Sequence, residues 1–460
     1  MADQTITETV QDNGQVRYEL GRAHWDPPRV PDLRQPGSTL VVPADRLIDV
    51  VILGDGYLTA ADFRAELVAW LDAFFKLAVY DTFAGALRVR ALFTPSAEPA
   101  SAARGSFFGC NVDDAGTGIV KSGGWWAAGD AKGTLFRRRL WDAVDSFTPL
   151  STRFYPPELD LGVTPEIADD LRGIYRNLVV SMLVRTAADN NVSGMTTEVR
   201  REPPEQARQV RVAFGANSIH EFSHAFGLLS DEYIDGRGEQ STRANPAVGN
   251  VYTLANLSYD DTDDSVPWLH LAPTGRFRRT GSGSGPSPVA GWLWAGGVKH
   301  LGVWHSEYRC LMNGTHDNFA YTQVAAQDPT ANPDGTYTDE NGAGLRDTGR
   351  FCSWCQEITV LRILEKTGQL AEPGDPADPN EQGRTWYERW AAGLRENYYR
   401  LFDVGGQLSA AEAGYAATNP GPAGEALWTS DLYSVPKASQ HQETGPVGPL
   451  ADDEMFLLLG

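Results

Sequence analysis

Cysteine, positive charge and long apolar runs are all in short supply in this sequence. Four cysteines in 460 residues are too few for a scaffold held together by disulfides. The 39 basic residues against 60 acidic ones leave a formal net charge of -21, which argues against the basic surfaces that nucleic acids and anionic membranes require. No segment approaches the ~20 apolar residues of a membrane-spanning helix. We therefore expect neither a nucleic-acid partner nor a membrane span.

The amino-terminal segment also lacks the marks of export. MADQTITETVQDNG has neither the basic start nor the apolar core of a secretion signal. The sequence as it stands therefore predicts a cytoplasmic protein. If a signal was removed earlier, or another export route is used, the protein is secreted instead.

Strand and helix patterns alternate along the first part of the chain. RLIDVVILGDGY, from Arg46, predicts a buried strand that ends in a glycine turn. Thr59 and Asp62 have the spacing of a helix-capping box, and apolar residues then recur at helical spacing from Phe63 to Phe74. LRVRALF alternates again as a strand. This order predicts the α/β class, with helices layered on a mixed sheet.

Two further strands are predicted before a short helix. NLVVSMLV (177–184) reads as strongly buried, and QVRVAF (209–214) reads as half-exposed and leads directly into the helix. If residues 209–214 formed an open edge of the sheet, they would favour an extended peptide as substrate, because such a peptide can add as a strand.

The stretch HEFSHAFGLLSDEY (220–233) carries the predicted chemistry. Residues four apart on a helix share a face, so His220 and His224 can both direct an imidazole nitrogen at one ion about 2 Å away. Glu221 is placed to contact water bound to that ion. Zinc lowers the pKa of such water to roughly 7, so the carboxylate can take its proton and pass it to a leaving amine. Alternatively Glu221 only caps the helix, because Ser218 and Glu221 also have capping-box spacing.

A third ligand has to come from beyond this helix. In an unbroken helix Asp231 would lie about 16 Å along the axis from His220, at 1.5 Å per residue, and could not reach the metal. If the helix ends at Gly227, which tolerates a left-handed turn, the chain can fold back and deliver an acidic group. Asp231 is the first choice for the third ligand, and Glu232 is the second.

Three segments of the chain resemble the IgA-peptidase family of metzincin-like zinc metallopeptidases. HEFSHAFGLLSDEY resembles the active-site signature of that family, including its DEY ending. IDVVILGDGY resembles its early strand-turn segment, and YRCLMNG followed by FCSWC resembles its later methionine and cysteine segment. The segments occur in the family's order and span about Leu47 to Leu364. The resemblance implies a zincin-like catalytic domain with a mixed sheet, an active-site helix and a Met-turn.

Carried over by position, the resemblance implies one zinc ion per chain. Its ligands and catalytic base would be His220, His224, Asp231 and Glu221. Met312 would be the methionine of the turn beneath the zinc. His305 and His316, near Met312 in the sequence, are candidate substitute ligands, with surface histidines as the alternative. Tyr233 either stabilises the oxyanion of the reaction or simply packs after the turn.

The chain divides into three parts on this interpretation. Residues 1–45 form a short leading segment, and residues 46–366 form the zinc metallopeptidase domain. Residues 367–460 form a Pro/Gly-rich extension with one amphipathic helix, which carries Trp386 and Leu401 on one side.

The cysteines have two interpretations. The first is structural, as a local disulfide or as buried thiols, and it allows a bridge from Cys310 to Cys352 or Cys355. The second is another metal site, although a structural zinc site usually shows two CxxC pairs and this chain has one. Cys110 lies far from the other three in sequence.

The function predicted from the sequence is a zinc-dependent endopeptidase that acts on a protein or peptide. One alternative is a zinc amidase that hydrolyses a non-protein amide such as cell-wall peptide. Another is a catalytically silent binding protein stabilised by zinc. The presence of Glu221 argues against the silent protein, because a structural site needs four closed ligands and no base. No pattern in the chain bears on the oligomeric state.

Overall fold

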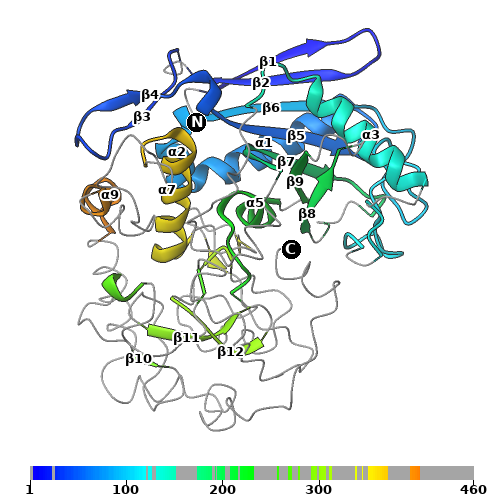
Figure 1. Cartoon of the computed structure of the whole chain (residues 1–460). Helices are drawn as coiled ribbons and strands as arrows, with labels where there is room; N and C mark the ends of the chain where they lie inside the picture. Colours follow the sequence, from blue (N-terminus) through cyan, green and yellow to red (C-terminus); the bar gives the residue numbers. More distant parts are fainter. Residues whose placement is uncertain are drawn as a thin grey trace.

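A computed structural model of the chain describes residues 4–22, 26–120, 123–126, 131–151, 173–188, 192, 194–201, 208–215, 218–232, 256–257, 268–271, 278–279, 292–297, 300–306, 310–312, 337–338, 344–345, 351–370 and 394–404. These residues form a mixed α+β structure in which helices flank a seven-stranded mixed sheet (Figure 1). The predicted α/β class is confirmed at this level.

The main sheet has the strand order β1-β2-β6-β5-β7-β9-β8. Its strands, in chain order, are β1 (Gln4–Val10), β2 (Val16–Arg22), β5 (Ile48–Asp55), β6 (Leu87–Phe93), β7 (Ile174–Val184), β8 (Met195–Arg200) and β9 (Gln209–Phe214). The four central strands β6, β5, β7 and β9 run parallel to one another. The strands at both ends pair antiparallel with their neighbours. Strands β1 and β2 belong to the predicted leading segment, which therefore extends the sheet.

The first strand-helix-strand unit forms as predicted. Strand β5 is buried along its whole length and pairs parallel with β6. Helix α1 (Ala60–Lys76) begins at Thr59, whose side chain accepts a hydrogen bond from the Asp62 amide at 3.2 Å. The apolar residues at helical spacing, including Phe63 and Phe74, are buried against the sheet. Local capping and periodicity together determined this unit.

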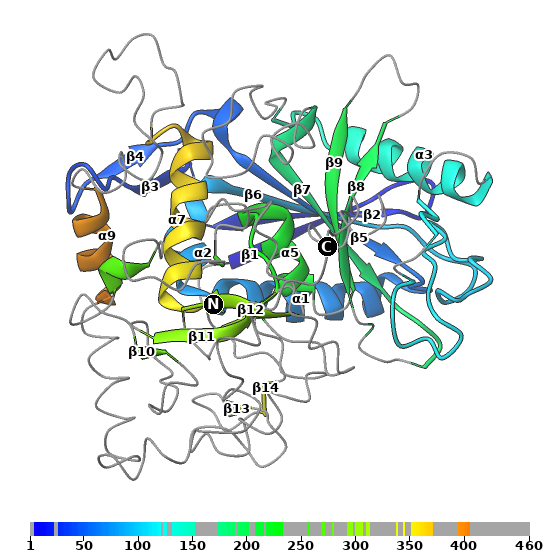
Figure 2. The same ribbon diagram turned by 60° about the horizontal axis from the view of Figure 1, so that its bottom comes forward.

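Helices cover both faces of the sheet. Helices α1, α5 (Ser218–Gly227) and α7 (Ser353–Thr367) share one core with the side chains of Val50 and Ile52 from β5. Helix α3 (Ala131–Asp145) packs on the opposite face with Val51 and Leu53. Figure 2 shows α1, α5 and α7 together on one side of the sheet. Because β5 alternates between two buried faces, it reads as a continuous apolar run.

The edge of the sheet near α5 differs from the expectation. Strand β9 lies between β7 and β8, so residues 209–214 are not at the edge. The end strand is β8, which no sequence pattern had indicated and which pairs antiparallel with β9. Strand β9 is consequently buried except at Gln209, and not half-exposed as predicted. Its Arg211 is accommodated in the interior by an ion pair with Glu198 of β8, at 3.1 Å.

Shorter elements complete the described structure. The small sheets and bridges use β3 (Arg29–Pro31), β4 (Thr39–Val41), β10 (Arg278–Arg279), β11 (Trp292–Gly297), β12 (His300–His305), β13 (Tyr337–Thr338) and β14 (Gly344–Leu345). The short helices are η1 (Ala44–Arg46), α2 (Ala78–Thr82), η2 (Ala84–Ala86), η4 (Leu269–Leu271) and α9 (Leu394–Phe402). Helix α9 is part of the predicted amphipathic helix, whose Trp386 lies outside the described residues. None of the helices described here is long and apolar enough to cross a membrane.

Candidate metal centres

Helix α5 carries the two histidines and is fixed to the core by its other side. It contacts β7, β8, β9, α1 and α7. Phe222 and Phe226 stack on each other at 5.5 Å, and Phe222 meets the ring of Phe74 edge-on at 5.1 Å. Both phenylalanines are fully buried. Because residues 222 and 226 lie on the apolar side, His220 and His224 are displayed away from that aromatic core.

The chain reverses direction at the end of α5, as predicted, but the residue in the left-handed conformation is not the predicted one. The left-handed residue is Leu228, with φ of 57°, and not Gly227, which is the last residue of the helix. The Leu228 amide donates a hydrogen bond to the His224 carbonyl at 3.2 Å. A left-handed leucine is uncommon and carries strain of about 1–2 kcal/mol. Burial of the Leu228 and Leu229 side chains offsets it.

The reversal brings Asp231 to both histidines. Its Oδ1 lies 3.0 Å from His220 Nε2 and 3.2 Å from His224 Nε2. The two Nε2 atoms lie 3.0 Å apart. We call these three residues the His–Asp site; they form a group with a geometry that can hold a metal ion. The structure therefore assembles the predicted first-choice set, and the predicted second choice, Glu232, points elsewhere.

Backbone carbonyls set the orientation of both imidazole rings. His220 Nδ1 lies 2.8 Å from the Leu311 carbonyl oxygen, and His224 Nδ1 lies 2.6 Å from that of Leu229. A carbonyl can only accept, so each Nδ1 carries the donated hydrogen. Each Nε2 then faces the common point, which is the arrangement seen where outer partners orient metal-binding histidines. No sequence pattern had indicated the role of either carbonyl.

The spacing of the three donor atoms fits a zinc ion. Donors at about 2.0–2.1 Å from zinc, arranged tetrahedrally, lie about 3.3 Å from one another. The observed separations of 3.0 to 3.2 Å are close to this value. Two imidazole nitrogens and a carboxylate oxygen are donor types that zinc prefers. Three protein donors also leave a fourth position for water or substrate, as catalytic zinc sites do.

In the His–Asp site, His220 and Asp231 shift each other's pKa toward the charged form. Burial alone lowers the pKa of His220, but the hydrogen bond and charge of Asp231, together with the charge of Glu221, outweigh it and raise the pKa to about 10. Burial likewise raises the pKa of Asp231, but His224 and His220 outweigh this effect and hold it well below its usual value. Asp231 is thus an anion over the whole neutral range, as a metal ligand must be.

The raised pKa predicts how zinc binding depends on pH. After chelation, His220 holds a proton at neutral pH, and zinc must displace it. The apparent zinc affinity of the chelated protein should therefore rise about tenfold per pH unit between about pH 7 and pH 9, and level off near the pKa of His220. Competition with a chromophoric chelator at several pH values measures this slope. An affinity that does not change over this range would show that His220 releases no proton on binding.

Glu221 reaches from α5 to the end strand of the sheet. Thr196 of β8 donates its hydroxyl to the Glu221 carboxylate at 3.1 Å and to its backbone carbonyl at 2.7 Å. Room for the glutamate depends on Gly194, where a Cβ atom would lie 2.5 Å from Glu221 Cγ and 2.4 Å from the Phe214 carbonyl oxygen. The carboxylate thus has a partner on β8. The side chain of Ser218, the partner in the capping alternative, lies outside the described residues.

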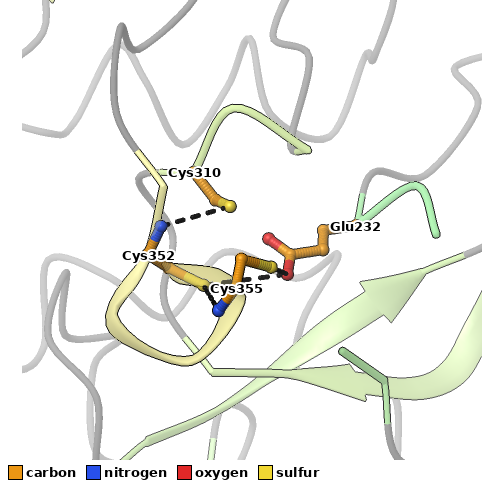
Figure 3. Close-up of side chains that lie close together, drawn as sticks. All are labelled: Glu232, Cys310, Cys352 and Cys355. Carbon is orange, nitrogen blue, oxygen red and sulfur yellow. Dashed lines mark hydrogen bonds between the residues drawn. The ribbon is translucent and has the colours of Figure 1, made fainter. Parts of the chain in front are cut away.

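A second group of ligand-type side chains, shown in Figure 3, includes the residue that directly follows Asp231. Its members are Glu232, Cys310, Cys352 and Cys355, and we call it the Cys–Glu site. All four are buried, and their ligand atoms lie within 4.8 Å of one another, so the group can hold a metal ion. All four cysteines are free thiols, so the predicted bridge from Cys310 is absent, and the buried-thiol and metal-site interpretations both fit the structure. Cys110 is remote from the group, with its amide bonded to Asp55 at 2.9 Å.

Burial dominates the electrostatics of the Cys–Glu site. It raises the pKa of Glu232 and of the thiols of Cys310 and Cys355 well above their usual values. Burial also acts to raise the pKa of Cys352, but hydrogen bonds from Cys310, Cys355 and Ser306 outweigh it, so its pKa is low. Four acidic groups in one dry space cannot all be charged together, unless a cation balances them.

Asn256 holds the short segment that contains Asp231. Its Nδ2 donates to the Ser230 carbonyl at 2.8 Å and to the Glu232 carboxylate at 3.1 Å. Its Oδ1 accepts from the Ser230 amide at 2.7 Å. The Glu232 amide in turn donates to the Met312 carbonyl at 2.8 Å. One fully buried side chain therefore fixes the residues on both sides of Asp231, and no motif in the sequence had marked it.

Removing this support should weaken metal binding without touching a ligand. Asn256→Ala removes the side-chain partner of the Ser230 amide and carbonyl and one of the partners of the Glu232 carboxylate. A buried polar group that loses its hydrogen bond costs about 1–3 kcal/mol. We expect zinc affinity at the His–Asp site to fall about 10–100-fold, as is typical of outer-shell changes. Isothermal titration of the chelated variant measures it.

The matched control is Asn177→Ala, which removes another fully buried asparagine, bonded to the carbonyls of Arg46 and Lys366. This variant should lower the melting temperature but leave zinc affinity near that of the wild type. Equal losses of affinity in both variants would mean that general destabilisation, and not the position of Asp231, controls the metal.

The other predicted residues have mixed outcomes. Met312 is fully buried in the core that α5 shares, and the preceding Leu311 supplies the carbonyl that orients His220, so this segment does adjoin the histidine helix. His305 is buried at the end of β12. Tyr233 and His316 lie outside the described residues.

Similarity to known proteins assigns no function to either site. No protein-family model matches the chain, and no curated protein matches it. The resemblance to the IgA-peptidase family therefore stays a prediction.

Proposed function

We propose that the protein is a zinc-dependent endopeptidase whose active site is the His–Asp site with Glu221 beside it. The observation that carries the proposal is the convergence of His220 Nε2, His224 Nε2 and Asp231 Oδ1 within 3.0 to 3.2 Å of one another. A zinc ion bound there would supply Lewis-acid catalysis and acidify a coordinated water to a pKa of about 7.

The residues of the chain have separate parts in this proposal. The Leu311 and Leu229 carbonyls orient the His220 and His224 rings through Nδ1, so that both Nε2 atoms face the point where the zinc ion would lie. Glu221 follows His220 directly and is close enough for its charge to raise the pKa of His220. Its carboxylate accepts the proton of the attacking water and delivers it to the leaving amine. Thr196 holds that carboxylate in place through its hydroxyl, at 3.1 Å.

The position of β8 favours a peptide as substrate. Among the described strands, β8 pairs with β9 alone and forms the end of the main sheet. It also contacts α5, through Thr196 and Glu221. An extended peptide can add to such an edge through backbone hydrogen bonds, which would carry its amide bonds past Glu221. Residues 209–214 cannot offer such an edge, because they are enclosed in the sheet.

The test is incubation of the zinc-loaded full-length protein with a diverse peptide library, with products read by mass spectrometry. We expect cleavage at internal peptide bonds that disappears on chelation and returns with added zinc. A parallel incubation with cell-wall peptide fragments separates the amidase alternative. Hydrolysis of those fragments alone would change the substrate class, and a zinc-loaded protein that cleaves neither set would refute the proposal.

A further inference from the structure

The Cys–Glu site brings four donors from three separate segments to one buried point. Glu232 follows the end of α5, Cys310 precedes Met312, and Cys352 and Cys355 lie at the start of α7 (Figure 3). Glu232 and Cys355 are separated by 123 residues in the chain, yet the Cys355 thiol lies 3.0 Å from the Glu232 carboxylate. All of the side chains belong to the interior, where ionisable groups are retained only with a partner or a metal.

The donors have the number and span of one tetrahedral ion. Two Zn–S bonds of about 2.3 Å at a tetrahedral angle place their sulfurs about 3.8 Å apart. The four ligand atoms of the Cys–Glu site lie within 4.8 Å of one another, so small side-chain adjustments suffice to close them on one ion. Thiolates select zinc over magnesium or calcium, and four protein donors leave no open position.

The surroundings of the sulfurs suit thiolates. The amides of Met312 and Cys352 donate to Cys310 Sγ at 3.5 and 3.3 Å. Cys352 Sγ accepts from the Cys355 amide and from the Ser306 hydroxyl, each at 3.3 Å. Cys352 is also the N-cap of α7, where the helix dipole favours negative charge. Four donors therefore point at two sulfurs, and such hydrogen bonds would stabilise thiolates once a cation balances their charge.

The two sites are joined by adjacent residues. Asp231 of the His–Asp site is followed directly by Glu232, and Cys310 is followed directly by Leu311, whose carbonyl orients His220. The Glu232 amide also donates to the Met312 carbonyl, which ties these two segments to each other. A metal in the Cys–Glu site would hold both segments at α7, and so would fix one ligand and one orienting carbonyl of the neighbouring site.

We propose that the Cys–Glu site is a second zinc site, structural and closed, that positions Asp231 and the Leu311 carbonyl of the His–Asp site. Its ligands are Glu232, Cys310, Cys352 and Cys355. The metal content that it predicts does not depend on peptide cleavage, so it can be tested even if the protein proves to have another activity.

Metal analysis of full-length protein, purified under reducing conditions without chelators, tests the stoichiometry. We expect about two zinc ions per chain in the wild type and about one in the His220→Gln/His224→Gln variant. Cys355→Ser should lose about one ion, and Glu232→Cys should keep two because it completes a four-cysteine site. The matched control is Cys110→Ser, which removes a buried thiol outside the site and should keep two.

Cobalt substitution tells the two sites apart. Cobalt bound by three thiolates gives intense thiolate-to-metal charge-transfer absorption in the near ultraviolet, and cobalt bound by two histidines and a carboxylate does not. We expect this absorption in the wild type and in the double histidine variant, stronger in Glu232→Cys. Because Cys355→Ser can fail to fold, the double histidine and Glu232→Cys variants carry the test.

Three results would overturn the proposal. The first is a double histidine variant that is folded but holds neither zinc nor cobalt. The second is an intact mass that shows a disulfide among Cys310, Cys352 and Cys355 in protein purified under native conditions. The third is zinc affinity at the His–Asp site that stays unchanged in a folded Cys355→Ser variant, which would refute the positioning role while leaving the metal.

Discussion

Replacement of Glu221 by glutamine is expected to leave zinc content and melting temperature close to those of the wild type while peptide cleavage falls about 10²–10⁴-fold. Glutamine has nearly the size of glutamate and can still accept the Thr196 hydroxyl, so the contact between α5 and β8 is kept. It cannot take up a proton at neutral pH, and the two histidine ligands are unchanged. Initial rates on a peptide identified from the library, with metal analysis of the same preparation, measure both quantities.

Two outcomes would assign Glu221 another role. A variant that keeps most of its activity would exclude it as the general base. A variant that loses stability along with activity would favour the helix-capping alternative. The matched control is Glu8→Gln on β1, which neutralises an exposed glutamate paired with Arg64 and should change neither rate nor metal content.

Much of the fold could be predicted because its information is local. Thr59 and Asp62 mark the start of α1, and the buried strand β5 reads as an unbroken apolar run. Strand β8 was missed because MTTEVR is short and polar, and its strand conformation depends on pairing with β9. The prediction that strand β9 is half-exposed is wrong because the strand contains Arg211. This arginine is buried in an ion pair with Glu198, which lies on the neighbouring strand β8.

In the candidate sites, too, some residues could be predicted from local sequence and others could not. The two histidines and Glu221 are encoded by spacing within one helix turn, which any helix at 220–224 would realise. The choice between Asp231 and Glu232 depends on the dihedral angles at Leu228, and on Asn256 and Met312, which are distant in the sequence. The same is true of the Cys–Glu site, because its donors are up to 123 residues apart. Local patterns specify elements, whereas ligand sets across loops require the tertiary structure.

Asp231→Asn is expected to have the largest effect on metal binding. Asparagine keeps the size of the side chain but removes the charge that both Nε2 atoms face, at 3.0 and 3.2 Å. A neutral amide oxygen is a poor zinc ligand, and two histidines alone hold zinc weakly. We expect zinc affinity at the His–Asp site to fall by more than the roughly 10–100-fold that follows from an outer-shell change.

Glu232→Gln is the matched comparison, because it makes the same chemical change one residue further along. Its carboxylate faces Cys355 at 3.0 Å and not the histidines, so its effect on the His–Asp site should be indirect and stay within the outer-shell range. Titration with cobalt separates the two sites, since only the Cys–Glu site gives thiolate absorption. If Glu232→Gln proves the more damaging at the His–Asp site, the assignment of the third ligand moves one residue along. If neither change matters there, a residue outside the described structure, such as His316, completes the site, and Asp231 serves only to hold the two imidazoles in register.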